Sequence, residues 1–502
     1  MPIIPPSSPS SLPTVPLWIN GAPHPSPSTL SLDKTPLFPV TSSLRNTPIH
    51  NAVSATPDDA LLACASASTA FTTWRKTAPA HRRSLLLKAA DIIERRAQEL
   101  MEMQVAETSC PKEFAAFNIQ AGVMYAREIA AATSELRGTV PQNREGPGGL
   151  DVGGLTVVVR EPVGVVLVIP PWNGAVVLPV RAMTIALAAG CTLVVKASEL
   201  CPRLHHLIAE CYEEAGIPKG VINVIQAKRE DAAPVVEAII AHKAVRKVDF
   251  IGSAAVGRKI GQVCAKYLKP ILMELGGKGP ALVLEDADLE KAAGLCALGA
   301  ILHHGQLCFS TERIIVHKAI YDQFIPLLVA AMSRIPKAGD AVTRESAIHA
   351  YDVLKDAEEK GAKFLVNGTE YISETSLKPT LVTNISEDAR IKDEETFGPS
   401  ASVYMAEDDD DAIQKANDSA YGLSAGVHSK NWEHAYNVAV QLEYGQVQIN
   451  HMTPMDSPNG PIKGVKGSGW GSSNSIWGIH EFSIEKTIAF HPSGERDNFV
   501  RH

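Results

Sequence analysis

From Glu161 to Glu274 the sequence alternates short apolar runs with longer stretches that have the length of crossover helices. Runs that are apolar throughout, rather than at every second residue, are typical of parallel strands covered by helices on both faces. The pattern therefore predicts an α/β fold around a Rossmann-type parallel sheet. The expected strands are 163–169, 192–195, 221–225, 247–251 and 271–274, with helices such as 203–215 and 232–241 between them.

A second alternation follows Glu274, with expected strands at 280–284 and 313–317 and a helix over 319–333. The chain has 502 residues, whereas a single hydrophobic core stops growing near ~250–300 residues. We therefore expect a second α/β domain that begins near Leu275. Before Glu161, apolar residues at helical spacing predict three helices, over 57–74, 81–106 and 112–136.

The segment 138–160 has a different character, because it is Gly-rich and ends in a β-branched run. We interpret it as an excursion of extended chain, and the tail near 485–491 has the same character. Such a segment is either a surface hairpin or an arm that pairs with another subunit, because exposed strand edges invite pairing.

Charge and composition disfavour several functions. A net charge of −8 and a pI near 6.1 argue against nucleic acid or an anionic membrane as the main partner. The most apolar stretch, 176–195, contains Pro179 and Arg181, so we interpret it as a buried helix and strand rather than a membrane span. The N-terminus lacks the basic flank and apolar core of a secretory signal. The eight cysteines include no C-x-x-C pair, which favours reduced thiols in the cytoplasm over disulfides or a metal site.

Small and polar residues follow the expected strands at the edge where parallel sheets bind ligands. Gly252, Ser253 and Gly257 form a turn into a helix, which either cradles a phosphate on free backbone amides or serves only helix–strand packing. Lys196 and Glu199 follow an earlier strand, where an ammonium and a carboxylate can hydrogen-bond a ribose diol. Because a carboxylate there repels a 2′-phosphate, these residues predict a dinucleotide site that prefers NAD and binds NADP more weakly.

Two residues are candidates for covalent and acid–base chemistry. Glu274 precedes two glycines at the domain junction, where it is either a general base or the partner of a lysine. Cys308 lies in a polar, Gly-containing turn of the kind a reactive thiolate needs, whereas Cys296 lies in an apolar run. His303 and His304 are close in sequence, but such a pair at a helix end is more often a cap or a surface feature than part of a Cys–His dyad.

Seven short motifs occur in the order seen in the aldehyde dehydrogenase superfamily, and the resemblance extends from about Leu17 to Phe482. The motifs are Pro171-Trp172-Asn173, Lys196–Glu199, Gly252–Gly257, Glu274–Lys278, Gly305–Cys308, Glu395–Pro399 and Tyr421–Leu423. Within the superfamily the chain most resembles the branch of salicylaldehyde, vanillin and benzaldehyde dehydrogenases.

The resemblance implies a role for each candidate. Cys308 would attack an aldehyde, and Asn173 with the Cys308 backbone amide would form an oxyanion hole. Glu274 would activate the water that hydrolyses the resulting thioester to a carboxylic acid. The implied NAD site consists of Trp172, Lys196, Glu199, Gly252, Ser253, Gly257 and Leu275 with Glu395 and Phe397 at the nicotinamide ribose, and no metal takes part.

The resemblance also implies a domain organisation. An NAD-binding domain would span 1–137 and 161–274, and a catalytic domain 275–483. The segments 138–160 and 484–502 would form an oligomerisation arm and tail, which join a homodimer or a homotetramer.

Three other functions are compatible with parts of this pattern. A dehydrogenase that passes the thioester to coenzyme A would generally lack a hydrolytic glutamate at Glu274. A thiol esterase would leave the nucleotide motifs unexplained. A structural protein that had lost its activity would not be expected to keep Cys308, Glu274, Asn173 and Glu199 together.

The substrate channel is where the chain departs from the family. The family usually has Asn at His303, often Phe or Ala at Gly174, and often Gly at Lys463. Gly174 removes side-chain bulk beside Asn173, which predicts a wide channel. Arg181 lies seven residues on, near helical phase with Gly174, so it either hydrogen-bonds an oxygen of the substrate or pairs with a carboxylate at a helix surface. With the resemblance, these residues predict a bulky aldehyde, either aromatic or polyketide-like, that carries an oxygen substituent.

Overall fold

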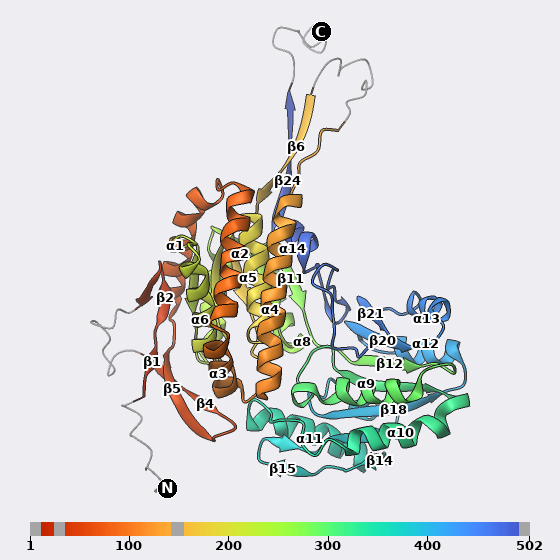
Figure 1. Ribbon diagram of the computed structural model, residues 1–502. Coiled ribbons are helices and arrows are strands. Elements are labelled where there is room, and N and C mark those ends of the chain that lie inside the picture. Colours follow the sequence, from red (N-terminus) through yellow and green to blue (C-terminus); the bar gives the residue numbers. More distant parts are fainter. Residues whose placement is uncertain (1–11, 25–35, 142–154, 491–502) are drawn as a thin grey trace.

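The computed structural model describes residues 12–24, 36–141 and 155–490 (Figure 1). The alternation before Glu274 forms an eight-stranded sheet in the order β23-β11-β10-β7-β8-β9-β2-β3. Its five central strands run parallel, which confirms the expected α/β fold. The central strands are β7 (Val165–Ile169), β8 (Thr192–Lys196), β9 (Ile222–Ile225), β10 (Val245–Ile251) and β11 (Ile271–Glu274), and β2 (Leu17–Ile19), β3 (Ala22–His24) and β23 (Gly469–Trp470) complete the sheet.

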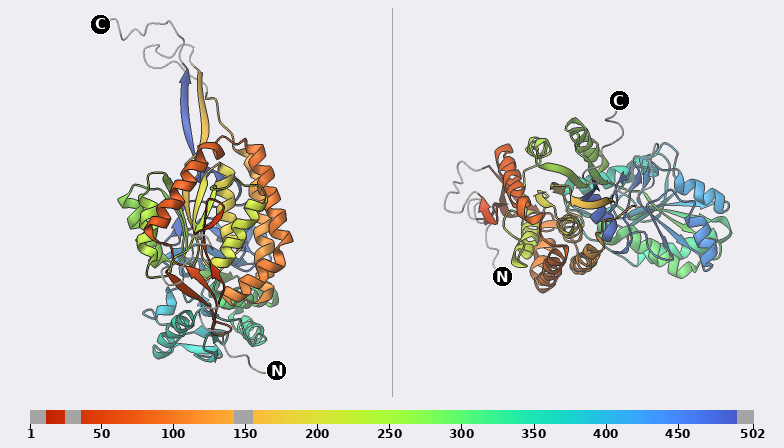
Figure 2. Two further views of the ribbon diagram at one scale, coloured as in Figure 1. Left: turned by 90° about the vertical axis from the view of Figure 1, so that its left-hand side faces the viewer. Right: turned by 90° about the horizontal axis from the view of Figure 1, so that it is seen from above.

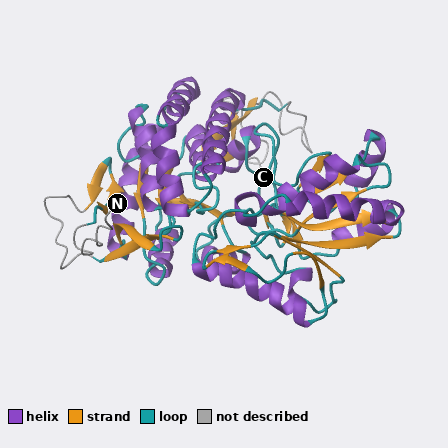
Figure 3. Ribbon diagram, turned by 60° about the horizontal axis from the view of Figure 1, so that its bottom comes forward, coloured by secondary structure: helices purple, strands orange, loops and turns teal. Residues whose placement is uncertain are grey.

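Helices cover both faces of this sheet, because successive residues of a strand point to opposite sides. Val165 and Leu167 pack on the side of α1 (Pro57–Trp74), α7 (Ala232–Ala241) and α8 (Ala254–Lys266). Val166 and Val168 pack on the other side, in one apolar cluster with residues of α2 (Pro79–Arg95), α3 (Ala97–Thr108), α4 (Lys112–Ala132), α5 (Val177–Ala189), α6 (Pro202–Glu214) and α14 (Ser475–Glu481). Figure 3 shows these helices flanking the strands.

The helix predicted over 81–106 is two helices, α2 and α3, which meet at Arg96. The Arg96 guanidinium donates to Glu99 in α3 and to Glu210 in α6, the latter at 3.0 Å. These contacts form across the break and involve a residue more than a hundred positions away, so helical periodicity alone does not reveal them.

The second alternation forms a seven-stranded sheet in the order β14-β17-β18-β13-β12-β20-β21. All neighbours are parallel except β14 with β17. Its strands are β12 (Gly279–Val283), β13 (Thr311–His317), β14 (Lys363–Val366), β17 (Thr380–Thr383), β18 (Ser400–Ala406), β20 (Ser424–His428) and β21 (Gln446–Ile449). The helices around it are α9 (Leu289–Ile301) and α10 (Tyr321–Ser333) in one apolar cluster, α12 (Asp409–Asn417) and α13 (Trp432–Ala439) in another, and α11 (Arg344–Glu359) in a third.

Two segments far apart in sequence form a ribbon that projects from the body of the molecule (Figures 1 and 2). Strand β6 (Leu155–Pro162) pairs antiparallel with β24 (Ser483–Phe490) along their whole length. The two extended segments expected to pair across subunits thus pair with each other, and residues 142–154 and 491–502 lie outside the described part. Four apolar side chains of the ribbon are exposed: Leu155, Ile484, Ile488 and Phe490. A smaller sheet of β1 (Thr14–Val15), β5 (Thr47–Val53) and β4 (Leu37–Ser42) lies near the other end of the molecule.

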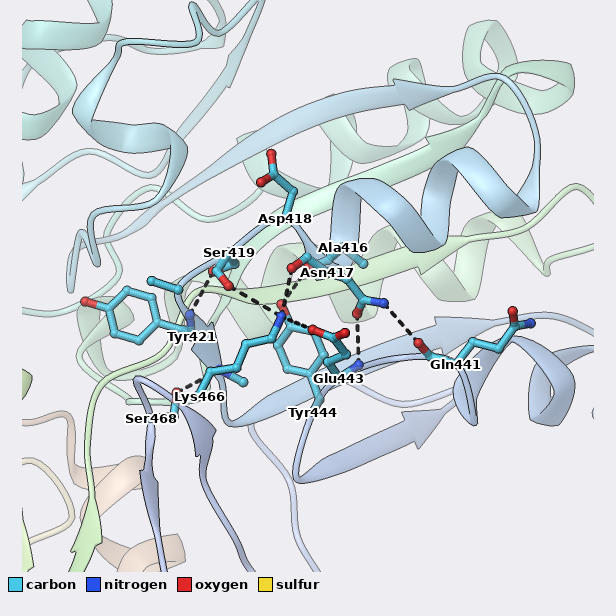
Figure 4. A network of polar contacts seen from close by, with 12 residues as sticks. Ala416, Asn417, Asp418, Ser419, Tyr421, Gln441, Glu443, Tyr444, Lys466 and Ser468 are labelled. Carbon is cyan, nitrogen blue, oxygen red and sulfur yellow. Dashed lines mark hydrogen bonds and ion pairs between the residues drawn. The ribbon is translucent and has the colours of Figure 1, made fainter.

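The chain connects the two large sheets twice. It passes from β11 to β12 through Leu275–Lys278, and it returns from β22 (Val465–Lys466) to β23. On the return, Lys466 donates to the Asn417 carbonyl at 2.8 Å, and the Ser468 hydroxyl accepts from the Gly422 amide at 2.9 Å (Figure 4). The same hydroxyl donates to the Gly276 carbonyl at 2.8 Å, so the two connections are bonded to each other.

A buried ion pair lies at the first connection. The Lys278 side chain is fully buried, and its ammonium contacts the Glu312 carboxylate at 2.5 Å and the Glu394 carbonyl at 2.6 Å. Glu312 in turn accepts from the backbone amides of Thr396 and Phe397. The ion pair of Lys278 and Glu312 therefore joins the first connection to strand β13 and to the loop 394–397.

Lys278→Met is expected to lower the free energy of unfolding by about 3–5 kcal/mol, because it leaves a buried carboxylate without its counter-ion. Lys318→Met is the matched control, since its pair with Glu407 is exposed and such pairs contribute about 0–1 kcal/mol. Urea denaturation of both variants makes the comparison. Equal losses in the two variants would show that the Lys278 pair does not hold the junction.

Candidate active site

Cys308, Glu274 and Asn173 come together where the two sheets meet. Asn173 follows β7, Glu274 ends β11, and Cys308 lies in the turn before β13. The Cys308 thiol donates to Oε1 of Glu274 across 3.9 Å. The other seven cysteines are buried, and Cys308 alone among the eight is partly exposed.

Glu274 has a cationic partner that the sequence did not identify. Its Oε2 forms an ion pair with Nη2 of Arg181 on α5, and each of the two side chains is only 3% exposed. Arg181 is therefore buried in the molecule, and the alternative that placed it at a helix surface is wrong. The partner of Glu274 is an arginine rather than the lysine considered as the alternative to a catalytic role.

The surroundings of Cys308 favour its protonated form. Burial raises the pKa of the thiol well above its usual value, and the negative charges of Glu274 and Glu395 raise it further. The Arg181 guanidinium opposes this rise in pKa only in part. In the structure the group therefore rests as a thiol, hydrogen-bonded to the carboxylate of Glu274.

Asn173 is held in place by the turn that precedes Cys308. Its Nδ2 donates to the Gln306 carbonyl at 2.9 Å, and the residue is 6% exposed. Next to it, Oδ1 of Asn118 accepts from the amides of Val176 and Val177 and so satisfies the free start of α5. Asn118 was not identified from the sequence, because nothing in the pattern of α4 distinguishes an asparagine that caps another helix.

A cavity of about 290 Å³ reaches Cys308 and Glu274 from the side of the first sheet. Most of the residues predicted to bind the cofactor line it, namely Trp172, Gly252, Ser253, Leu275, Glu395 and Phe397. Gly257 is not among the lining residues, and a Cβ on it would lie 2.6 Å from the Leu275 side chain. Of the two interpretations of that glycine, the structure thus supports close packing of α8 on the sheet.

The loop 394–397 carries two of these residues. The Glu395 carboxylate accepts from the Gly277 amide at 3.0 Å, and a Cβ on Gly276 would displace this carboxylate from its present position. Burial and the neighbouring Glu312 charge raise the pKa of Glu395 to about 8. Phe397 has a left-handed backbone, with φ of 50°, and its ring stands edge-on to that of Trp172 at 6.0 Å.

Lys196 and Glu199 lie together, apart from the cavity at Cys308. They form an ion pair at 3.2 Å, and Glu199 lines a separate cavity of about 940 Å³ together with Lys228 and Arg229. Burial alone would raise the pKa of Glu199, but the positive charges of Lys196 and Arg229 lower it below its usual value. Arg229 follows β9 and was not identified from the sequence.

A second cavity, of about 100 Å³, reaches Cys308 from the side of α4 and α5. Gly174 lines it, but Arg181 does not. Helix α5 begins at Val177, so Gly174 precedes the helix and the helical phase that linked it to Arg181 does not apply. A Cβ on Gly174 would lie 2.8 Å from the Leu178 side chain, so Leu178 fills the space that the glycine leaves. The wide channel that the sequence predicted beside Gly174 is therefore not found there.

His303 and His304 do not form a dyad with Cys308 and are not surface residues. Both are buried with left-handed backbones. The His303 ring stacks on Phe114 at 4.3 Å, and Nε2 of His304 accepts from the Leu377 amide. Burial lowers the pKa of His303 to about 3 and that of His304 to about 4, so neither carries charge near neutral pH.

The described residues contain neither a cluster of metal ligands nor a membrane-spanning helix. No group of three or more His, Cys, Asp or Glu side chains in 12–24, 36–141 and 155–490 is placed to hold a metal ion. No helix in those ranges is long and apolar enough to cross a membrane.

Comparison with known proteins gives a consistent result. The aldehyde dehydrogenase family profile matches residues 31–488. The chain is 39% identical to a vanillin dehydrogenase of Pseudomonas fluorescens over 480 residues, which cover 93% of this chain and 96% of that protein. It is 36% identical to a salicylaldehyde dehydrogenase of Pseudomonas putida, over 91% and 94% of the two chains. Among solved structures, a salicylaldehyde dehydrogenase from Pseudomonas putida G7 in complex with salicylaldehyde superposes with a TM-score of 0.91 at 34% identity, over 97% of this chain and 100% of that one.

Proposed function

The chain belongs to the aldehyde dehydrogenase family, and we propose that it oxidises an aromatic aldehyde to the carboxylic acid with NAD, through a thioester on Cys308. The observation that carries the proposal is the contact of the one partly exposed cysteine with Glu274, where two cavities meet. A nucleophile at such a meeting point can face a cofactor on one side and a substrate on the other.

In the proposed reaction the Cys308 thiol first releases its proton to solvent, and the resulting thiolate attacks the carbonyl carbon of the aldehyde. The negative oxygen that forms accepts hydrogen bonds from the Asn173 side-chain amide and the Cys308 backbone amide. Each such donor is worth about 2.7–4 kcal/mol in comparable sites. Asn173 supports this role because its bond to Gln306 already fixes its position in the wall of the cavity.

Residues of the larger cavity at Cys308 would hold the nicotinamide end of the cofactor, which supplies a hydride acceptor when bound. Trp172, Leu275, Glu395 and Phe397 line that cavity, and glycine at 276 leaves room for Glu395. Ser253, in the same lining, caps α8, whose amino end favours a phosphate. Lys196 and Glu199 would bind the adenosine ribose.

Glu274 would serve as the base that activates water to hydrolyse the thioester. Its position supports this role, because Oε1 of Glu274 lies against the Cys308 thiol while Oε2 is held by Arg181. Transfer to coenzyme A and simple ester hydrolysis remain the alternatives, and neither requires both the cofactor cavity and Glu274. An assay of NADH formation with and without coenzyme A separates the three.

The proposed substrate class is supported by the relatives of the chain and by the smaller of the two cavities that reach Cys308. The most similar relatives compared are named as vanillin and salicylaldehyde dehydrogenases. The cavity beside α4 and α5 has a mostly apolar wall that suits an aromatic ring, with contributions from Phe114, Phe117, Leu178, Leu302 and Leu307.

We further propose a cytoplasmic location and a homo-oligomeric state. The location is supported by the eight cysteines, all free thiols. The oligomer is supported by the ribbon, whose exposed Leu155, Ile484, Ile488 and Phe490 suit a contact with another copy.

Light scattering at micromolar concentration is expected to give at least twice the chain mass of 53.7 kDa. Ile488→Asp should shift the mass toward that of one chain, because it places a charge on the apolar ribbon. A single-chain mass for the unaltered protein would contradict the oligomer.

Cys308→Ala is expected to abolish NADH formation and to leave NAD binding intact, because it removes the nucleophile but no cofactor contact. Cys64→Ala, a buried cysteine on α1, is the matched control and should retain activity. Activity in Cys308→Ala would exclude the covalent mechanism.

Glu274→Gln is expected to release about one NADH per site rapidly and then to turn over slowly, because only the hydrolysis of the thioester loses its base. Stopped-flow absorbance resolves the two phases, and thermal unfolding checks that loss of the Arg181 pair leaves the protein folded. If the first turnover slows as much as the later ones, Glu274 is not specifically the base of hydrolysis.

NAD is expected to be preferred over NADP by about tenfold to a few hundredfold, about 1–3 kcal/mol, because Glu199 repels a 2′-phosphate. Glu199→Gln should lower the ratio of kcat/KM with NAD to kcat/KM with NADP, because it leaves Arg229 free to attract the phosphate. Glu230→Gln, in the wall of the same cavity, is the control and should keep the ratio. Equal efficiency of the unaltered enzyme with both cofactors would refute the role of Glu199.

A further inference from the structure

The smaller cavity beside Cys308 is not uniformly apolar. Three polar side chains that the proposed reaction does not use also line it, and Oδ1 of one of them, Asn118, already accepts from the start of α5. The other two are Tyr125 on α4 and Asp456 in the loop between β21 and β22. They come from segments more than three hundred residues apart and face the same space.

The Tyr125 hydroxyl makes no hydrogen bond of normal length and angle within the described part of the chain, and the Asp456 carboxylate is its near neighbour. The residue is only 3% exposed. Buried hydroxyls nearly always have a well-formed hydrogen bond, because an unpaired one loses the bonds that it makes to water in the unfolded chain. Burial raises the pKa of Tyr125 well above its usual range, and the nearby Asp456 charge raises it further, so the phenol keeps its proton and can donate it in a hydrogen bond.

Asp456 is also weakly engaged. The hydrogen bond recorded for its carboxylate among the described residues is a long one, 3.5 Å from Nδ2 of Asn474. Arg181 lies close enough to interact electrostatically with Asp456 and Tyr125, but its guanidinium is already paired with Glu274 and does not line the cavity. Besides Asn118 and Asn173, the cavity thus offers a donor on Tyr125 and an acceptor on Asp456.

We propose that Tyr125 and Asp456 together bind a hydroxyl group on the aromatic ring of the aldehyde, and so make the enzyme specific for hydroxylated aromatic aldehydes. Asp456 would accept the hydroxyl proton and Tyr125 would donate to the hydroxyl oxygen. This inference rests on the proposed function. It assigns to Tyr125 and Asp456, which line the cavity, the hydrogen bond to a substrate oxygen that the sequence predicted for Arg181.

The pair discriminates among substituents by their hydrogen-bonding capacity. A methyl group leaves both residues unpaired, a methoxy group leaves Asp456 without a donor, and a carboxylate is repelled by Asp456. Sites built to bind a hydroxyl reject analogues that lack it far more strongly than apolar pockets reject a missing methylene. A ring hydroxyl is the one of these substituents that satisfies both residues.

The test compares kcat/KM for 2-, 3- and 4-hydroxybenzaldehyde with kcat/KM for benzaldehyde, in the unaltered enzyme and in Tyr125→Phe and Asp456→Asn. Both substitutions keep the side-chain volume and remove one hydrogen-bonding function. We expect each to lower kcat/KM for the best hydroxylated substrate about 10- to 100-fold, in line with one lost hydrogen bond in a buried site, and to change benzaldehyde less than about threefold. Tyr351→Phe and Asp322→Asn, on α11 and α10, are the matched controls and should change neither value.

A second measurement does not require turnover. Isothermal titration calorimetry should show that the unaltered protein binds the best isomer of hydroxybenzyl alcohol more tightly than benzyl alcohol, and that either variant loses the difference. Equal losses for hydroxylated and unsubstituted benzaldehyde, or no loss for either, would overturn the inference. If no aromatic aldehyde is oxidised but the alcohols are still distinguished through Tyr125 and Asp456, the proposed function fails and the binding site stands.

Discussion

The buried ion pair of Lys278 and Glu312 is the constraint on which the site depends. It joins the first connection between the sheets to β13 and to the loop 394–397, and thereby places Glu395 and Phe397 opposite Trp172. An ion pair removed from water contributes little net stability, but breaking it leaves a charge that the interior cannot accommodate. The geometry of the larger cavity at Cys308 is therefore coupled to the folding of the second sheet.

A second set of buried charges governs the reacting groups. Arg181 pairs with Glu274, and burial together with the charges of Glu274 and Glu395 raises the pKa of the Cys308 thiol. Attack on an aldehyde needs the thiolate, so the first step should become faster as pH rises toward the raised pKa of Cys308. The same arrangement pairs the guanidinium of Arg181 with Glu274, so that Arg181 does not line the cavity beside α4 and α5.

The sequence predicted the elements that local patterns determine, and the structure supplied the contacts between distant segments. Apolar runs located the parallel strands, and the Gly-Gly and Gly-Gln turns marked Glu274 and Cys308. The break at Arg96, the pairing of β6 with β24 and the late strand β23 in the first sheet depend on residues far apart in sequence. The same holds for the partners of Glu274 and Lys278, for Asn118 and for the facing pair Tyr125 and Asp456. The prediction that Arg181 shares a helix face with Gly174 is wrong, because it assumed a helix across residues 174–176, which precede α5.

The central claim is that the reaction proceeds through a thioester on Cys308 that Glu274 helps to hydrolyse. Its most direct measurement is mass spectrometry of Glu274→Gln quenched with acid after mixing with NAD and a hydroxybenzaldehyde. We expect an acyl group, lighter than the aldehyde by two hydrogens, to accumulate on the peptide that contains Cys308, and the unaltered enzyme to show far less of it. Absence of this adduct during turnover, or its presence on another cysteine, would contradict the thioester mechanism.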